Sequence, residues 1–255
     1  MKKLLLTVTT LAMVASGTPP EAWPLDPMGS ELLPELTSQA AFSCQDLTLA
    51  GNSVVTSEGL GTGVEGDEGD VRSNANVRLK GSVEVHGDAI AGPDGEVILS
   101  GQPALVTGEM LSAAELLDCR PIDLAALAAE LELSNDNDLL PRTDKGKKPF
   151  KKGRDFELKG NDGITLPTGT YLFDPLKITG NSEVRPDGEV RILVLGEIDV
   201  SGRIHAGGNP FELRLWSAGA SVKLNSQSVV HGHLYAPDAA VKLAGGSTFG
   251  GSLFA

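Results

Sequence analysis

The chain has 255 residues and a formal net charge of −13 at pH 7, with 31 glycines, 15 prolines and 4% aromatic residues. This charge favours solubility and argues against general binding to nucleic acid or to anionic membranes. The shortage of aromatic side chains leaves few of the usual contacts for a tight binding site.

The N-terminus predicts export. Residues 1–17 read MKKLLLTVTTLAMVASG, in which two lysines precede an apolar run and then small residues. This order is typical of a secretory signal peptide, and the apolar run is shorter than the ~20 residues that a membrane-spanning helix needs. We therefore expect cleavage near residue 17, no transmembrane span afterwards, and a periplasmic, outer-surface or extracellular location. The proline-rich residues 18–40 are expected to form a linker or cap.

Three later segments share one pattern. VRLKGSVEVHGDAIA (77–91), VKLNSQSVVHGHLYA (222–236) and VKLAGGSTFGGSLFA (241–255) align without a gap, and the last two start 19 residues apart. Short runs of alternating apolar and polar residues are typical of strands with one buried face, and a repeat of this length predicts stacked turns. Residues 41–255 are thus predicted to form an all-β, right-handed parallel β-helix, or solenoid. A β-sandwich is the alternative.

One segment departs from this pattern. Residues 112–141 are rich in alanine, leucine and glutamate, with Leu124, Leu127 and Leu131 at helical spacing and Asp123 ahead of them as an N-cap. We expect a helical insertion that leaves the solenoid, packs on one flank and returns near Phe156.

The chain has two cysteines, Cys44 and Cys119, 75 positions apart. An oxidising compartment would permit a disulfide between them, which would stabilise the fold by about 4 kcal/mol. Two free, buried cysteines are the alternative.

His231 and His233 are the candidate metal ligands, because residues two apart on a strand project from one face. No third ligand aligns with them, so decoration of the surface is the preferred interpretation, and no cofactor is expected. The acidic runs EGDEGD (65–70) and NDND (135–138) lack calcium-loop spacing and are interpreted as solvated loops.

A basic run stands out in this acidic chain. Residues 142–154, RTDKGKKPFKKGR, hold seven cationic side chains and one aspartate. Such a run could dock on anionic envelope polymers, or it could be a mobile, solvated loop. The candidate contact residues are Arg142, Lys145, Lys147, Lys148, Lys151, Lys152 and Arg154.

Two further segments carry a family resemblance. LPTGTYLFDPLKITGN (166–181) and GHLYAPDAAVKLAG (232–245) resemble an uncharacterised β-helix domain of exported bacterial proteins, some of which carry it behind a minor-pilin-like N-terminus. The resemblance extends over residues 77–255. It implies the solenoid fold and brings no catalytic residue.

The resulting hypothesis is an exported, non-enzymatic β-helix with a structural or adhesive role at the bacterial cell envelope, whose partners are envelope polysaccharide or other surface proteins. One alternative is an enzyme acting on acidic polysaccharide, with Glu197, Asp199 and Asp187 as candidate carboxylates. A second is a self-polymerising, bactofilin-like scaffold. Phe249, Leu253 and Phe254 lie in what is expected to be the last turn. Its unpaired edge would permit end-to-end association unless the N-terminal segment or the helical insertion shields one end.

Overall fold

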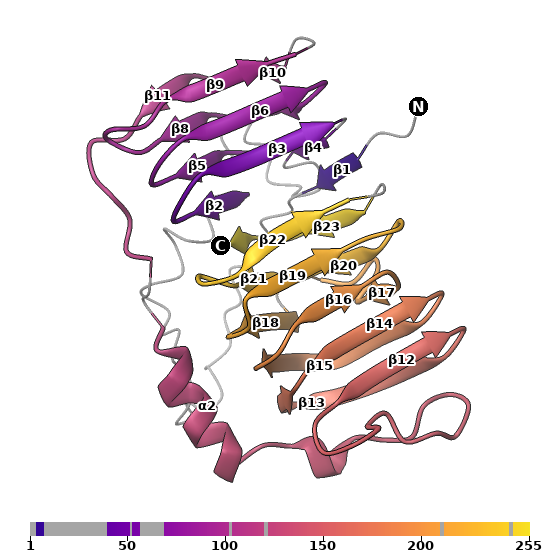
Figure 1. Cartoon of the computed structure of the whole chain (residues 1–255). Coiled ribbons are helices and arrows are strands. Elements are labelled where there is room, and N and C mark those ends of the chain that lie inside the picture. Colours follow the sequence, from indigo (N-terminus) through magenta and orange to yellow (C-terminus); the bar gives the residue numbers. More distant parts are fainter. Residues whose placement is uncertain are drawn as a thin grey trace, which may run out of the picture.

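The computed structural model describes residues 4–7, 40–51, 53–56, 69–101, 104–119, 122–209, 212–244 and 247–255. These residues form a β-solenoid of about eight turns built from parallel strands (Figure 1). The solenoid has three sides, and successive turns add neighbouring strands to each side. The predicted solenoid is therefore confirmed.

The N-terminal half forms one end of the stack. Its first side is β3-β6-β9, its second side is β4-β7-β10, and its third side is β2-β5-β8-β11. The strand β1 (Leu4–Thr7), from the predicted signal peptide, pairs in parallel with β4 on the second side. The other strands are β2 (Ala41–Ser43), β3 (Leu47–Gly51), β4 (Ser53–Thr56), β5 (Val71–Ser73), β6 (Val77–Gly81), β7 (Glu84–Val85), β8 (Ala89–Ala91), β9 (Val97–Ser100), β10 (Leu105–Val106) and β11 (Met110–Ser112).

The C-terminal half forms the other end. Its first side is β12-β14-β16-β19-β22. The long strand β15 passes from the second side, where it pairs with β17, to the third side, where it pairs with β18. The strands are β12 (Phe156–Gly160), β13 (Gly163–Phe173), β14 (Leu176–Gly180), β15 (Glu183–Val194), β16 (Ile198–Val200), β17 (Arg203–Ile204), β18 (Leu213–Ser217), β19 (Ser221–Leu224), β20 (Val229–His231), β21 (His233–Tyr235), β22 (Ala240–Leu243), β23 (Thr248–Gly250) and β24 (Leu253–Phe254).

The N-terminal and C-terminal halves meet where the last strand, β24, pairs with the early strand β2. On the third side the strand order is β11-β8-β5-β2-β24-β21-β18-β15, so the last strand pairs with β2. Ala41 is the register partner of Leu253, and Phe42 of Phe254. The last turn therefore does not present an unpaired edge on this side, because residues more than 200 positions earlier, from the N-terminal half, cover it.

A return segment, residues 113–155, connects the far end of the N-terminal half with the opposite end of the stack (Figure 1). It contains α2 (Leu124–Leu133), the one α-helix among the described residues, and the 3-10 helix η1 (Asn137–Leu139). Asp123 caps α2, and its carboxylate accepts hydrogen bonds from the N–H groups of Ala125 and Ala126 at 3.0 and 2.9 Å. The predicted helix and cap are confirmed.

The helix packs on the outer face of the third side. Leu124, Leu127 and Leu131 are buried there, as the helical spacing predicted. Their outer-face partners on the strands are also buried and apolar: Phe42, Leu172, Leu193, Trp216, Tyr235 and Phe254. This second apolar layer explains why β15, β18, β21 and β24 carry consecutive apolar residues rather than strict alternation.

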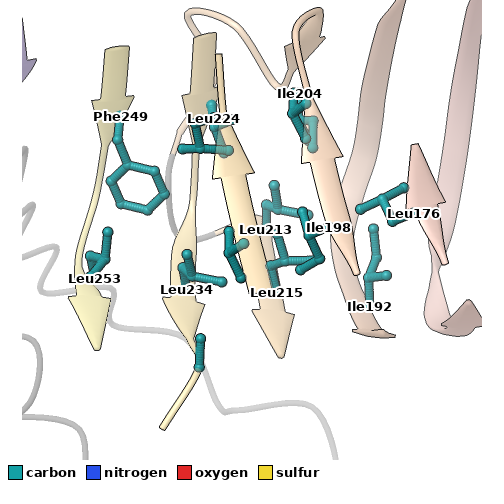
Figure 2. Close-up of a cluster of buried hydrophobic side chains, with 14 of the residues drawn as sticks. Leu176, Ile192, Ile198, Ile204, Leu213, Leu215, Leu224, Leu234, Phe249 and Leu253 are labelled. Carbon is teal, nitrogen blue, oxygen red and sulfur yellow. The ribbon is translucent and has the colours of Figure 1, made fainter. Parts of the chain in front are cut away.

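Inside the solenoid, register-matched side chains form columns. On the third side one column runs Ile192, Leu215, Leu234, Leu253, Ala41, Val71 and Ala89 across both halves, each residue pairing with the next. Figure 2 shows part of this interior in the C-terminal half. Because every turn places its apolar residues in the same columns, the core is continuous along the stack.

The glycine shared by the aligned repeats lies at the corner between the second and third sides. A Cβ atom at Gly251, where φ is +125°, would lie 2.0 Å from the carbonyl oxygen of Gly232 in the preceding turn. The position requires glycine because backbones of adjacent turns approach too closely for a side chain.

Candidate functional sites

The two candidate metal ligands lie on different strands. His231 ends β20 and His233 begins β21, with the corner residue Gly232 between them. The N–H of Gly207 donates to Nδ1 of His231 at 3.2 Å, whereas Nδ1 of His233 lies 2.6 Å from the Ser252 hydroxyl. The expectation that they share a strand face is therefore wrong. Nowhere in the described ranges do three His, Cys, Asp or Glu side chains gather as metal ligands.

Burial disfavours the charged form of both histidines. It lowers the pKa of His231, and it lowers the pKa of His233 to about 4, with a smaller contribution from the charge of Arg214. His233 is therefore neutral at physiological pH, where it interacts with Ser252 on the next turn.

The cysteines are joined. A disulfide links Cys44, directly after β2, to Cys119 in the return segment, with 5.6 Å between the Cα atoms. Asn74 holds the same part of the return segment through hydrogen bonds with the Leu117 carbonyl at 2.8 Å and the Leu117 N–H at 3.0 Å. The bond fastens the return segment next to the junction of the two halves.

The basic run belongs to an ordered end cap, residues 135–155, that covers the edge of the first C-terminal turn. The N–H of Asp136 donates to the Thr170 carbonyl (2.9 Å), that of Asp144 to Gly163 (2.7 Å), and that of Glu157 to Pro149 (3.1 Å). These contacts reach β13 and β12, so the cap satisfies strand edges that would otherwise be open.

Side chains fix the cap from inside. The ring of Phe150 contacts those of Phe156 and Phe173, with centroids 6.0 and 5.7 Å apart. Burial raises the pKa of the Asp162 carboxylate, but hydrogen bonds from the Thr143 hydroxyl and from the Lys145 and Gly163 N–H groups outweigh this effect and hold its pKa below the ordinary value. A charged, hydrogen-bonded carboxylate thus sits beneath the cationic surface.

The cationic side chains of the cap divide into two groups. Arg154 pairs with Glu132 of α2, and Lys151 pairs with Glu157 of β12. The other five residues are exposed on the outer surface of the cap: Arg142, Lys145, Lys147, Lys148 and Lys152.

The candidate carboxylates do not form one site. Glu197 pairs with Lys223 at 3.5 Å, and Asp199 accepts a hydrogen bond from Asn225 at 3.4 Å, both on the first side. Asp187 lies in β15, which runs over the second and third sides. The run NDND also has another role, since the Asp136 carboxylate accepts from the Thr170 N–H at 2.7 Å. Residues 65–68 of the other acidic run lie outside the described residues.

Sequence reasoning missed a groove of about 750 Å³ between β3 and β22, lined by residues that include Leu47, Leu49, Val241 and Leu243. These residues fit the regular apolar columns, so no local signal in the sequence marks them. The groove depends on which turns are neighbours in space.

The fold and these sites define a parallel β-solenoid in which the two ends of the β region meet. Residues 174–255, from the corner before β14 onward, match the model of a domain of unknown function (DUF7305). This agrees with the expected uncharacterised family over that part of the chain. No curated protein and no solved structure matches the chain. Within the described part of the chain, no helix is both long and apolar enough to cross a membrane.

Proposed function

We propose that this chain is an exported, non-enzymatic solenoid with a structural or adhesive role at the bacterial cell envelope, and that its end cap binds anionic envelope polysaccharide. The disulfide between Cys44 and Cys119 supports export, because disulfides persist mainly in oxidising compartments. The signal-peptide pattern of residues 1–17 supports the same location.

The exposed cations of the end cap carry the proposal. Five cationic side chains project from one end of a chain whose net charge is −13. The backbone beneath them is held by the Asp162 carboxylate and by hydrogen bonds to β12 and β13. Binding therefore costs little ordering of the backbone, and a concentrated positive field attracts a polyanion.

Binding to immobilised polygalacturonate and to lipopolysaccharide, measured over a series of salt concentrations, tests the proposal. We expect affinity to fall steeply with salt, and the K145E/K147E/K148E/K152E variant to bind at least about tenfold more weakly. The matched control, K80E/K177E/K223E/K242E, makes the same change of charge on the first side of the solenoid. Affinity that ignores salt, or an equal loss in both variants, would contradict the proposal. Release of reducing ends from polygalacturonate would contradict the non-enzymatic role.

A further inference from the structure

One corner of the solenoid is shorter than the corners stacked on either side of it. Between the first and second sides, Val200 at the end of β16 and Arg203 at the start of β17 are three positions apart. Their register partners on the neighbouring turns bound the ranges 178–183 and 224–229, so these partners are five positions apart. The corner between β16 and β17 therefore lacks two residues that both neighbouring corners have.

The missing residues leave a notch in the surface. It has a volume of about 250 Å³ and lies between the corner of the preceding turn and that of the following turn. The backbone at the short corner is drawn inward: a Cβ atom at Gly202 would lie 2.5 Å from the carbonyl oxygen of Ser182 and 2.8 Å from a methyl carbon of Ile178. Glycine is required there because the neighbouring turn is too close for a side chain. Since backbone forms this part of the notch, its position is fixed by the stack.

The lining of the notch is polar. Asn181 comes from the preceding corner, Ser226 and Gln227 come from the following corner, and Ser201 and Arg203 come from the short corner itself. Apart from these five, the described residues that line the notch are glycines, so its one formal charge is positive. The notch therefore offers hydrogen-bonding groups around a single guanidinium.

The guanidinium of Arg203 is accessible to a ligand. Arg203 is exposed, and no ion pair joins it to a carboxylate within the described ranges. Glu183, its register partner on β15, lies 3.4 Å from Arg185 instead. The Asp199 carboxylate accepts a hydrogen bond from Asn225. A carboxylate on a ligand could therefore form a charge-assisted, two-point contact with Arg203.

The amide of Asn181 provides a second kind of contact. Its Nδ2 donates to Oδ1 of Asn161, one turn earlier, at 3.2 Å. The short corner has no residue at the corresponding position, so this ladder of amides stops at the notch. In the part of the chain that the structure describes, the Asn181 carbonyl oxygen and the Gln227 amide make no hydrogen bond with protein. Such amides both donate to and accept from hydroxyl groups.

The corner that follows the notch is held in an uncommon backbone conformation. Ser226 and Gln227 have φ angles of +54° and +65°. This left-handed region favours glycine, which Gly180 supplies at the preceding corner with a φ of +74°. The chain thus carries polar side chains at positions where glycine would be less strained, and these side chains line the notch.

We propose that the notch binds one hexuronate unit, a sugar ring that carries a carboxylate, with the carboxylate on Arg203 and ring hydroxyls on the amides of Asn181 and Gln227. A planar guanidinium matches a carboxylate at two points, and the amides match neighbouring hydroxyls. Affinity should be low, because no aromatic ring among the lining residues stacks on the sugar. The site lies two turns from the end cap and does not rest on the binding of polysaccharide proposed there.

Titration of ¹⁵N-labelled protein with sodium galacturonate, followed by two-dimensional NMR, tests the site. We expect saturable shifts of the N–H signals of Gly180, Gly202 and Gln227, with a dissociation constant roughly in the millimolar range. Galactose lacks the carboxylate and leaves Arg203 unpaired. It should therefore bind at least about tenfold more weakly than galacturonate.

Two variants and a matched control separate the site from general effects of charge. R203Q removes the guanidinium and should weaken binding at least about tenfold. The control K242Q removes one exposed positive charge on β22 and should bind like the unmodified chain. Insertion of Gly-Asn between Ser201 and Gly202 restores the five-position corner, repeats the pair found at the preceding corner, and should abolish binding. Unfolding temperatures check that each variant folds.

Four outcomes would overturn the proposal: no saturable shifts, shifts confined to the end cap, equal binding of galactose and galacturonate, or equal binding by R203Q and K242Q. The K145E/K147E/K148E/K152E variant of the end cap should bind galacturonate like the unmodified chain. Failure of the notch and failure of the cap are therefore distinguishable, because a monosaccharide tests the notch and salt-dependent binding of a polymer tests the cap.

Discussion

At the scale of single residues, position within a turn decides what a side chain can do. His231 and His233 read as neighbours on one strand face, but Gly232 places a corner between them. Each histidine then interacts along the stack, with Gly207 or with Ser252. The pair therefore contributes to contacts between turns rather than to a shared ligand set.

His233 should make stability depend on pH. Its folded-state pKa of about 4 lies below the ~6.5 of an exposed histidine, so the unfolded chain binds more protons between these values. The stabilisation is complete above about pH 6.5 and is lost as pH falls toward about 4, by roughly 3 kcal/mol at most.

The H233N variant tests this dependence in urea unfolding at several pH values. We expect its unfolding free energy to fall less between about pH 6.5 and 4 than that of the unmodified chain, because asparagine does not titrate. H86N, at an exposed histidine of the N-terminal half, is the control. Identical pH profiles for H233N and the unmodified chain would refute the assignment.

At the scale of elements, the return segment holds the two halves together. It covers the outer apolar face of the third side with α2, closes one end of the stack with the end cap, and is tied to the junction by the disulfide. The sequence predicted the helix, its buried leucines and its cap because these depend on local spacing. It did not show that the basic run is ordered, since the acceptors at Gly163 and Thr170 belong to strands that follow it.

Removal of the disulfide should lower the free energy of unfolding by up to about 4 kcal/mol, because a closed loop of this size restricts the unfolded chain. The C44S/C119S variant tests this by urea unfolding. The unmodified chain with reductant should move toward the variant, and the variant should not respond to reductant. A variant as stable as the oxidised chain would contradict the expectation.

At the scale of the whole molecule, the order of turns in space differs from their order in the sequence. The aligned repeats predicted the columns, since alternation within each turn fixes which residues face inward. They could not predict that β24 pairs with β2, because every turn presents similar edges and nothing local distinguishes one neighbour from another. The groove between β3 and β22 could not be predicted from the sequence for the same reason.

The two ends of the stack should behave differently in self-association. The end cap covers one end, whereas the other presents β9, β10 and β11 with Leu105 and Met110 about half exposed, at 50% and 54%. Because only one end of the stack has an open strand edge, two molecules can associate head to head, but a filament, which needs two open ends, cannot form. We expect sedimentation velocity to show a monomer–dimer equilibrium that shifts to monomer in L105R/M110R.

The control for this prediction is L133R, at a helix residue that is 91% exposed and distant from the open end. It should associate like the unmodified chain. Species larger than a dimer would show that the cap does not block stacking. A strict monomer at high concentration would show that the open end is not adhesive.

The pairing of β2 with β24 also determines when during synthesis the stack can be completed. The ribosome makes β2 more than 200 residues before β24, so the strand that pairs with β2 on this side does not exist until that later part of the chain has been synthesised. During this time the N-terminal turns lack the neighbouring strand that β24 provides on the third side. Only the pairing of β24 with β2 then closes the stack.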